Sequence, residues 1–339
     1  MNRNGPLAGR RQSVDTRSAA WVAPTGTPGL PLEVAGTRDG VDPAEWARTH
    51  RDTVTGWLRR HGAVLFRGFG VGLDGFGDVV HALAGSPEAY VERSSPRTAL
   101  GHHLYTATDH PADQPIPPHN ENSYQLRFPG RLVFGCLTPA RTGGATPLAD
   151  TRRVLGRLDP AVVAAFARRG VLYQRNYGDG IGMSWQDAFQ TRDKAAVTAY
   201  CVARRVDVEW KPDGGLRTTQ VRPALAVHPA TGERVWFNHA AFFHVSARPP
   251  ALRDALLAQF DERDLPSHTF YGDGGPIEPA VMEELHRAYA AELVAPAWRA
   301  GDVLLVDNLL TAHGREPFTG ERRVVVGMAQ PLDWDEVSA

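Results

Sequence analysis

Cysteine is scarce in this chain of 339 residues, which contains only Cys136 and Cys201. Two cysteines are too few for a disulfide framework or for a cysteine-based zinc or iron–sulfur site. No apolar run approaches the roughly 20 residues that span a bilayer, and no apolar segment follows the N-terminal charges. The formal net charge is -1 and no long run of Lys or Arg is present, so neither nucleic acid nor a membrane is an expected partner. We therefore expect a cytoplasmic protein.

The hydrophobic content of 42% is ample for a globular core. Residues 1–25 are rich in Gly, Pro, Arg and Ser and show little apolar periodicity, which predicts a flexible tail. No change of composition divides the remainder, so we expect a single domain over 26–339. Within it, the glycine-containing stretch 173–205 is a candidate lid insertion, although an ordinary helical insertion would explain it equally well.

Short β-type runs and helical stretches follow one another along the chain. Residues 42–62 carry the capping signals of a helix. The β-type runs are bounded by turn residues and include 63–69, 131–137, 302–308 and 322–330. This pattern favours a mainly β fold with flanking helices, built as a barrel or a sandwich. A doubly wound α/β fold fits poorly, because strands and helices do not alternate and no Gly-x-Gly-x-x-Gly follows a strand.

His119 and Glu121 stand two residues apart in the stretch 117–124. In an extended strand, residues i and i+2 share a face, so the imidazole and the carboxylate could bind the same metal ion. The same spacing occurs at His50 and Asp52, but there a helix is predicted, in which i and i+2 diverge. A surface-loop histidine is the ordinary alternative, and a facial iron triad needs a third ligand.

A candidate third ligand, His313, follows a β-type run late in the chain. A barrel brings early and late strands side by side, which would place His313 near the first pair. Arg322 and Arg323 follow at the start of the last β-type run, where one guanidinium can point inward and clamp a carboxylate. Judged alone, each would be an ordinary turn or surface residue. Taken together they indicate a metal centre beside an anion-binding arginine.

These residues, with Gly143-Gly144-Ala145-Thr146 and Asp307-Asn308, resemble the Fe(II)/2-oxoglutarate dioxygenases of the taurine dioxygenase (TauD/TfdA) family over about residues 60–332. The resemblance implies a double-stranded β-helix, or jelly-roll, core. It implies that Fe(II) is bound by His119, Glu121 and His313, with a coordination position left for O2. It also implies that the distal carboxylate of the cosubstrate 2-oxoglutarate is bound by Thr146 and Arg323.

Two positions depart from the family pattern. Glu121 stands where most of the family has Asp, which lengthens the ligand by one methylene and still permits the triad. Gly327 stands four residues after Arg323, where the taurine enzyme has its sulfonate-binding arginine. A sulfonate substrate is therefore not expected.

Residues 92–97, 117–124, 184–186 and 236–239 are similar to the branch that includes syringomycin-type aspartyl hydroxylases of natural-product biosynthesis. This resemblance implies oxidation, most simply hydroxylation, of an unactivated C–H bond, with release of succinate and CO2. The implied substrate is an amino acid, either free or bound to a peptidyl carrier protein. Desaturation or cyclisation of a small acid remains an alternative. Halogenation is disfavoured, because Glu121 takes the coordination position that a halide would need.

Polar residues near the motifs are candidates for substrate contact. An arginine could clamp a substrate carboxylate, and amide or phenol groups could line the pocket. The candidates are Arg93, Arg97, Asn120, Asn122, Tyr124, Asn238 and Arg315, with Arg127, Trp185, His239 and Asn308 as further polar or aromatic residues. Each of them could instead have a purely structural role.

Two other classes of protein are alternatives to a dioxygenase. Two His and one Glu also form a known zinc set, so a zinc hydrolase is an alternative, but the sequence has no His-Glu-x-x-His helix to supply a base. A barrel that binds without catalysis is the second alternative. The intact ligand set and the carboxylate clamp argue against it.

Overall fold

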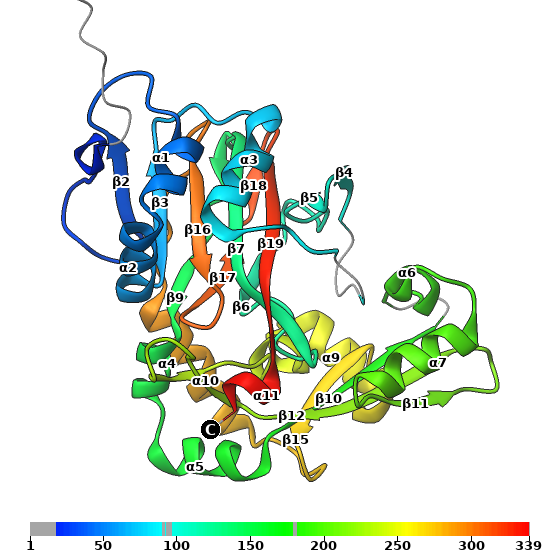
Figure 1. The fold of residues 1–339 in the computed structure, drawn as a ribbon. Helices are drawn as coiled ribbons and strands as arrows, with labels where there is room; N and C mark the ends of the chain where they lie inside the picture. The colour runs from blue at the N-terminus through cyan, green and yellow to red at the C-terminus, as the bar shows by residue number, and fades with distance from the viewer. Residues whose placement is uncertain (1–17, 90–91, 93–96, 179–181, 339) are drawn as a thin grey trace, which may run out of the picture.

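The computed structural model describes residues 18–89, 92, 97–178 and 182–338. Its framework is an eight-stranded sheet in the order β1-β2-β3-β16-β7-β19-β5-β4 (Figure 1). Neighbouring strands are antiparallel except for β2 and β3. The strands are β1 (Val22–Pro24), β2 (Leu32–Gly36), β3 (Ala63–Arg67), β4 (Ala99–Gly101), β5 (Leu104–Thr106), β7 (Arg127–Thr138), β16 (Val303–Asp307) and β19 (Arg323–Asp333).

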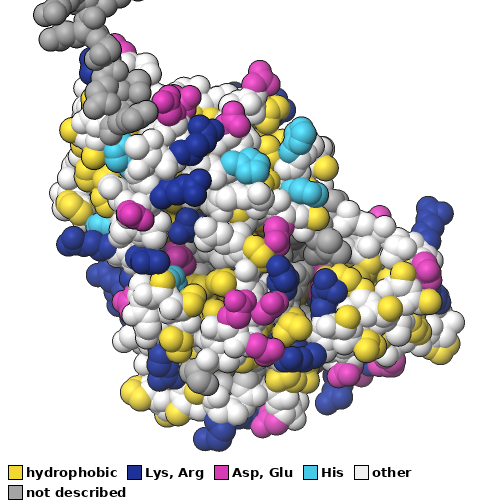
Figure 2. All heavy atoms as spheres, in the orientation of Figure 1, with side chains coloured by type: hydrophobic (Ala, Val, Ile, Leu, Met, Phe, Trp, Pro, Cys, Tyr) yellow, Lys and Arg dark blue, Asp and Glu magenta, His cyan; other side chains and the backbone are white. Residues whose placement is uncertain are grey.

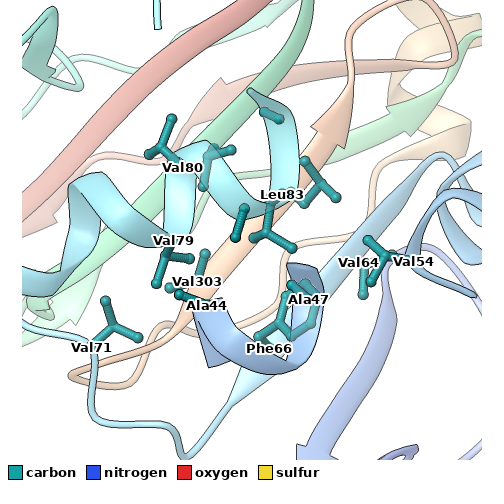
Figure 3. Packing of buried hydrophobic residues seen from close by; sticks show 14 of the residues in the cluster. Ala44, Ala47, Val54, Val64, Phe66, Val71, Val79, Val80, Leu83 and Val303 are labelled. Carbon is teal, nitrogen blue, oxygen red and sulfur yellow. The ribbon is translucent and has the colours of Figure 1, made fainter. Parts of the chain in front are cut away.

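One face of this sheet is covered by α1 (Pro43–Thr49), α2 (Arg51–His61) and α3 (Leu73–Ala84). Figure 3 shows side chains of α1 and α3 gathered over Phe66 of β3 and Val303 of β16. Each large aliphatic side chain buried there contributes roughly 1.5–3 kcal/mol. The Asp42 carboxylate caps α1 by accepting from two backbone N–H groups. The single helix predicted over 42–62 is in fact two helices that meet at His50.

The opposite face of the sheet packs against a smaller sheet. Val324, Val326 and Met328 of β19 join Phe134 of β7 and Leu148 in one hydrophobic cluster. Leu148 belongs to a three-stranded sheet in the order β6-β17-β9, made of β6 (Ile116–His119), β17 (Thr311–Arg315) and β9 (Leu148–Asp150). A separate antiparallel pair is formed by β8 (Thr142–Gly143) and β18 (Phe318–Thr319), which are neighbours of β9 and β17 in the sequence.

A segment from β10 to β12, here called the arm, extends to one side of the large sheet (Figure 1). It has a hydrophobic cluster of its own that includes Tyr177, Trp185, Phe189 and Leu216. The candidate lid 173–205 lies within it. Its elements are β10 (Val171–Tyr177), α6 (Trp185–Phe189), α7 (Lys194–Ala203), β11 (Asp207–Trp210) and β12 (Leu216–Arg222), and β10 also pairs with β15 (Ser267–Tyr271).

Most of the remaining elements pack around a further cluster that contains Phe166, Trp236 and Leu285. They are α4 (Thr151–Arg157), α5 (Pro160–Arg169), β13 (Leu225–Val227), β14 (Arg234–Trp236), α8 (Ala240–Phe243) and α10 (Pro279–Glu292). The other helices are α11 (Trp334–Val337), which packs in a separate cluster with Phe128 and Phe237, and α9 (Pro250–Gln259), whose described residues are all at least partly exposed. Three short 3-10 turns complete them: η1 (Ala19–Trp21), η2 (Val245–Ala247) and η3 (Glu262–Asp264).

The structure is a mixed one, with many strands and eleven α-helices over its described residues. Of the tail expected over 1–25, residues 1–17 lie outside the described residues, and 22–24 form β1, which pairs with β2. None of the described helices is long and apolar enough to cross a membrane. On the face shown in Figure 2, basic side chains are interspersed with acidic ones, in keeping with the small net charge.

Candidate metal and cosubstrate site

The pairing of β6 with β17 brings two histidines from distant parts of the chain together. His119, the last residue of β6, is the direct antiparallel partner of His313 in β17. Glu121 follows two residues later and is buried. Its Oε2 lies 3.8 Å from Nε2 of His119 and 3.6 Å from Nε2 of His313. One ligand atom from each of the three residues lies within 4.8 Å of the others, so the expected triad is assembled.

The backbone around Glu121 is held by two buried asparagines. Asn308 accepts from the Glu121 N–H at 2.8 Å and donates to the Glu121 carbonyl at 2.9 Å. Asn120 donates to the Asn308 carbonyl at 2.6 Å. Neither side chain lines the cavity described below. Their contacts tie the ligand-bearing loop to the end of β16, which gives both residues a structural role.

The donor set fits a metal ion. Nδ1 of His119 lies 2.9 Å from the Pro117 carbonyl, which can only accept, so Nδ1 carries the proton and Nε2 offers its lone pair. Burial and the neighbouring His119 lower the pKa of His313 to about 4, which keeps it neutral at pH 7. Burial opposes ionisation of Glu121, but Arg97 and the two histidines hold its pKa well below the usual range. Two neutral imidazoles and one carboxylate are a set that Fe(II) accepts.

Arg97, expected as a candidate for substrate contact, lies against the triad. Its Nη2 is 3.0 Å from Oε1 and 2.9 Å from Oε2 of Glu121, and both side chains are buried. The guanidinium therefore orients the carboxylate as well as forming part of the cavity wall.

A cavity of about 230 Å³ opens beside the two histidines and includes Thr146 and Arg322 in its lining. The Thr146 hydroxyl accepts a hydrogen bond of 3.1 Å from Nε1 of Trp298. Nε of Arg322 donates to the Gly144 carbonyl at 2.8 Å. Burial, with a smaller effect from Arg315, lowers the pKa of Arg322 to about 10. The hydroxyl and the guanidinium form a place for a carboxylate.

The residue chosen from the ten-residue spacing, Arg323, does not point into this cavity. Its side chain is exposed at the first position of β19, whereas the preceding Arg322 lines the cavity. The reason is the two-residue alternation of a strand. Arg322 is in phase with Val324 and Val326, which face the interior between the two sheets. Arg322, and not Arg323, is therefore the arginine of this pair that lines the cavity.

Several other candidates for substrate contact have structural partners. Tyr124 donates to the Glu92 carbonyl at 3.1 Å. Asn238 donates to the Ala224 carbonyl at 2.8 Å and accepts from the Ala240 N–H. Arg315 lines the cavity, but its terminal nitrogens donate to the carbonyls of three residues, His110, Pro111 and Gln114.

The remaining candidates within the described residues do not belong to the cavity lining. Asn122 is buried with a left-handed φ of 56°, and Arg127 is on the surface beside Glu88 and Asp333. Trp185 belongs to the core of the arm. His239 packs edge-on against His119, with ring centroids 5.5 Å apart. Arg93 lies outside the described residues.

Sequence reasoning missed several residues of the cavity wall. Arg175 and Tyr177 reach it from β10, Phe242 from α8, and Arg248 from the segment before α9. The alternation of β10 places Arg175 and Tyr177 on one face, which is a local signal. For Arg248 and for Trp298 beside Thr146, no motif in the sequence indicated the position.

Comparisons with known proteins agree with this geometry. The family model of the taurine catabolism dioxygenase TauD, TfdA family matches residues 25–329. The dapdiamide synthesis protein DdaC of Enterobacter agglomerans is 40% identical over 310 residues, which are 91% of this chain and 93% of DdaC. A clavaminate synthase-like protein of Arabidopsis thaliana is 32% identical over 295 residues, 84% of this chain and 86% of the relative.

The fold is also similar to a solved structure. PvcB, described as an Fe, alpha-ketoglutarate dependent oxygenase from an isonitrile synthetic pathway, matches with a TM-score of 0.53 and 16% identity over 100% of both chains. The family match leaves the zinc-hydrolase and non-catalytic alternatives without support. The chain therefore belongs to the taurine catabolism dioxygenase TauD, TfdA family, and is an Fe(II)- and 2-oxoglutarate-dependent oxygenase.

Proposed function

We propose that His119, Glu121 and His313 bind Fe(II), that Thr146 and Arg322 bind 2-oxoglutarate, and that the enzyme oxidises a C–H bond of an amino-acid substrate. One observation carries the proposal: His119 and His313, whose ligand atoms cluster with that of Glu121, line a cavity that also contains Thr146 and Arg322. Hydroxylation is the simplest outcome. Desaturation or cyclisation of a small acid would use the same site.

The residues of the chain position the reactants. Bound Fe(II) and 2-oxoglutarate supply the oxidising chemistry from O2, with succinate and CO2 as products. Three protein ligands on one side leave the opposite coordination positions open. Because the Thr146 hydroxyl accepts from Trp298, its own proton is available to a carboxylate oxygen. The bond from Arg322 to the Gly144 carbonyl fixes the plane of the guanidinium, so that its fork can meet the same carboxylate.

The substrate class rests on the relatives and on the sequence. DdaC is named for dapdiamide synthesis and PvcB for an isonitrile pathway, which supports a role in natural-product biosynthesis. The sequence resemblance to aspartyl hydroxylases supports an amino acid, either free or attached to a peptidyl carrier protein. The present cavity of about 230 Å³ is of a size that suits a small molecule.

Two structural roles follow from the same proposal. We infer that the eight-stranded and three-stranded sheets are the two faces of a jelly-roll core, because the cluster with Phe134, Val324 and Leu148 lies between them. We also infer that the arm acts as a lid that excludes water once the substrate is bound. Its residues Tyr177 and Met183 line the cavity.

Loss of one ligand tests the metal site. Incubation with Fe(II), 2-oxoglutarate, O2 and a panel of amino acids should release succinate, and His119→Ala should abolish that release. The anaerobic visible band of the Fe(II)–2-oxoglutarate form should disappear in the same variant. His81→Ala, which changes an exposed histidine of α3, is the control and should retain both. A His119→Ala protein that keeps the band would contradict the ligand assignment.

The two adjacent arginines test the cosubstrate site. Arg322→Gln should raise the half-saturating concentration of 2-oxoglutarate by about 10- to 100-fold, because it removes a charge-assisted pair. Arg323→Gln should leave it unchanged, since that side chain is exposed. The measurement is succinate formation against 2-oxoglutarate concentration. If Arg323→Gln produced the larger effect, the assignment to Arg322 would be wrong.

A further inference from the structure

The cavity beside the triad is strongly cationic. Five of its lining residues are arginines, whereas none of those in the described part of the chain is Asp or Glu. The arginines are Arg97, Arg175, Arg248, Arg315 and Arg322. In the proposed function, Fe(II), 2-oxoglutarate and the Glu121 carboxylate together carry about one net negative charge. Most of the positive charge of the five arginines therefore remains after both are bound.

Four of the five arginines already have partners. Arg97 pairs with Glu121, and Nη1 of Arg175 lies 3.9 Å from Oε1 of Glu92. Arg315 donates to main-chain carbonyls, and Arg322 serves 2-oxoglutarate in the proposed function.

Arg248 differs from the other four. Its terminal nitrogen is 3.4 Å from Oγ of Ser267, and within the described residues no carboxylate forms an ion pair with it. Arg248 is exposed to solvent, although the protein around it still lowers its pKa by burial. A guanidinium at the wall of a cavity with no acid paired to it can bind an incoming anion.

The position of Arg248 suits the recognition of a substrate. It stands between η2 and α9, and it also lines a second cavity of about 220 Å³. Gly182, Pro266 and Ser267 belong to both linings. Arg248 is thus at the junction of the two cavities and shares the first of them with His119 and His313. A small molecule whose carboxylate meets Arg248 would extend from there toward the metal.

We propose that Arg248 binds a carboxylate of the substrate and selects for a free carboxylic acid over its neutral derivative. This inference rests on the proposed function and deepens it. A free amino acid carries such a carboxylate, whereas an amide has lost it. A thioester to a carrier protein has also lost its α-carboxylate.

The test compares acids with amides. The protein loaded with Fe(II) and 2-oxoglutarate is given each proteinogenic L-amino acid and, separately, the corresponding α-amide; Asp and Glu are also compared with Asn and Gln. At least one acid should stimulate succinate release with a KM about 10- to 100-fold below that of its amide, the size expected for a charge-assisted pair. In Arg248→Gln the KM of the acid should rise to that of the amide, and Arg248→Lys should recover part of the difference.

The matched control is Arg253→Gln. Arg253 lies in α9, is paired with Asp254 and belongs to neither cavity lining, so this variant should keep the preference for the acid. All variants should keep the 2-oxoglutarate half-saturation of the parent, which shows that folding and the cosubstrate site are intact. An Arg248→Gln protein that keeps the preference overturns the inference, as does a parent that prefers amides or responds to no acid. If the parent protein also fails to bind 2-oxoglutarate, that result contradicts the proposed function as well as the role of Arg248.

Discussion

Glu121 shares its carboxylate between the two histidines and Arg97. Oε2 faces the Nε2 atoms of both histidines, and Nη2 of Arg97 lies 2.9 Å from Oε2 and 3.0 Å from Oε1. If a metal took Oε2, Oε1 would still be within reach of the guanidinium. Because Glu is longer than Asp and has one more rotatable bond, Arg97 also limits the conformations of the ligand.

Arg97→Gln should weaken metal binding about 10- to 100-fold, the usual effect of losing a partner that orients a ligand. An equilibrium titration of the apoprotein with Mn(II), a redox-stable substitute for Fe(II), measures this affinity. Arg97→Lys should recover part of it, since one charged hydrogen bond can be restored.

The control for Arg97 is Arg127→Gln, which changes an exposed arginine of β7 and should leave the Mn(II) affinity unchanged. Equal affinities in the Arg97→Gln and parent proteins would show that the triad holds its geometry without this arginine.

At the scale of elements, the sequence predicted much of the framework. The apolar runs at 131–137 and 302–308 are the central strands β7 and β16, because their alternating residues face cores on both sides. The helical stretch at 42–62 was located, but it contains two helices. At His50 the backbone leaves the helical region, with φ -116° and ψ 37°, and the ring makes a local contact with Trp46 four residues earlier, with centroids 4.6 Å apart.

The cluster of His119, Glu121 and His313 could be predicted only from several signals together. The His-x-Asp/Glu spacing also occurs by chance in this chain, and it was the later His313 and the family resemblance that pointed to one site, where the structure brings the three side chains together. Arg323 was predicted from its distance to His313 along the sequence. In the structure Arg323 is exposed, whereas Arg322, two residues before the inward-facing Val324, lines the cavity. Arg248 depends on how η2 and α9 are placed in space, which no local pattern encodes.

A group of histidines links three elements near the cavity. His268 of β15 and His244, which precedes η2, have ring centroids 4.3 Å apart, and His286 of α10 contacts Ser246 of η2. Burial lowers the pKa of His268 to about 4, and its Nδ1 accepts from the Val245 N–H. Protonation would remove that acceptor.

The free energy of unfolding should therefore depend on pH through His268. Its pKa is lower in the folded state than the unfolded value of about 6.5, so the stabilisation is complete above 6.5 and is lost as the pH falls toward 4. The loss should be on the order of 2 kcal/mol by pH 4.5. Denaturant unfolding of the parent and of His268→Gln at pH 7 and 4.5 measures it. A variant with the same pH dependence as the parent would show that His268 does not contribute.

For the whole molecule, the metal site is completed by residues that are 194 positions apart, at 119 and 313. Binding to such a site requires the folded core, so ligands should stabilise the folded state. Mn(II) and 2-oxoglutarate at about 100 times their Kd should add about 3 kcal/mol each, seen as a higher Tm in thermal unfolding. His119→Ala should lose the shift due to Mn(II). An equal shift in that variant would indicate that the metal binds elsewhere.

The pairing of β6 with β17 also brings the two backbones so close together that only glycine fits at position 314. A Cβ on Gly314 would lie 2.5 Å from the Ile116 carbonyl oxygen, so any other residue would push the two strands apart beside His313. A chain emerging from a ribosome carries His119 and Glu121 long before this contact can form. The three-ligand site therefore exists only once β17 is paired with β6, so the capacity to bind the metal is a property of the folded core alone.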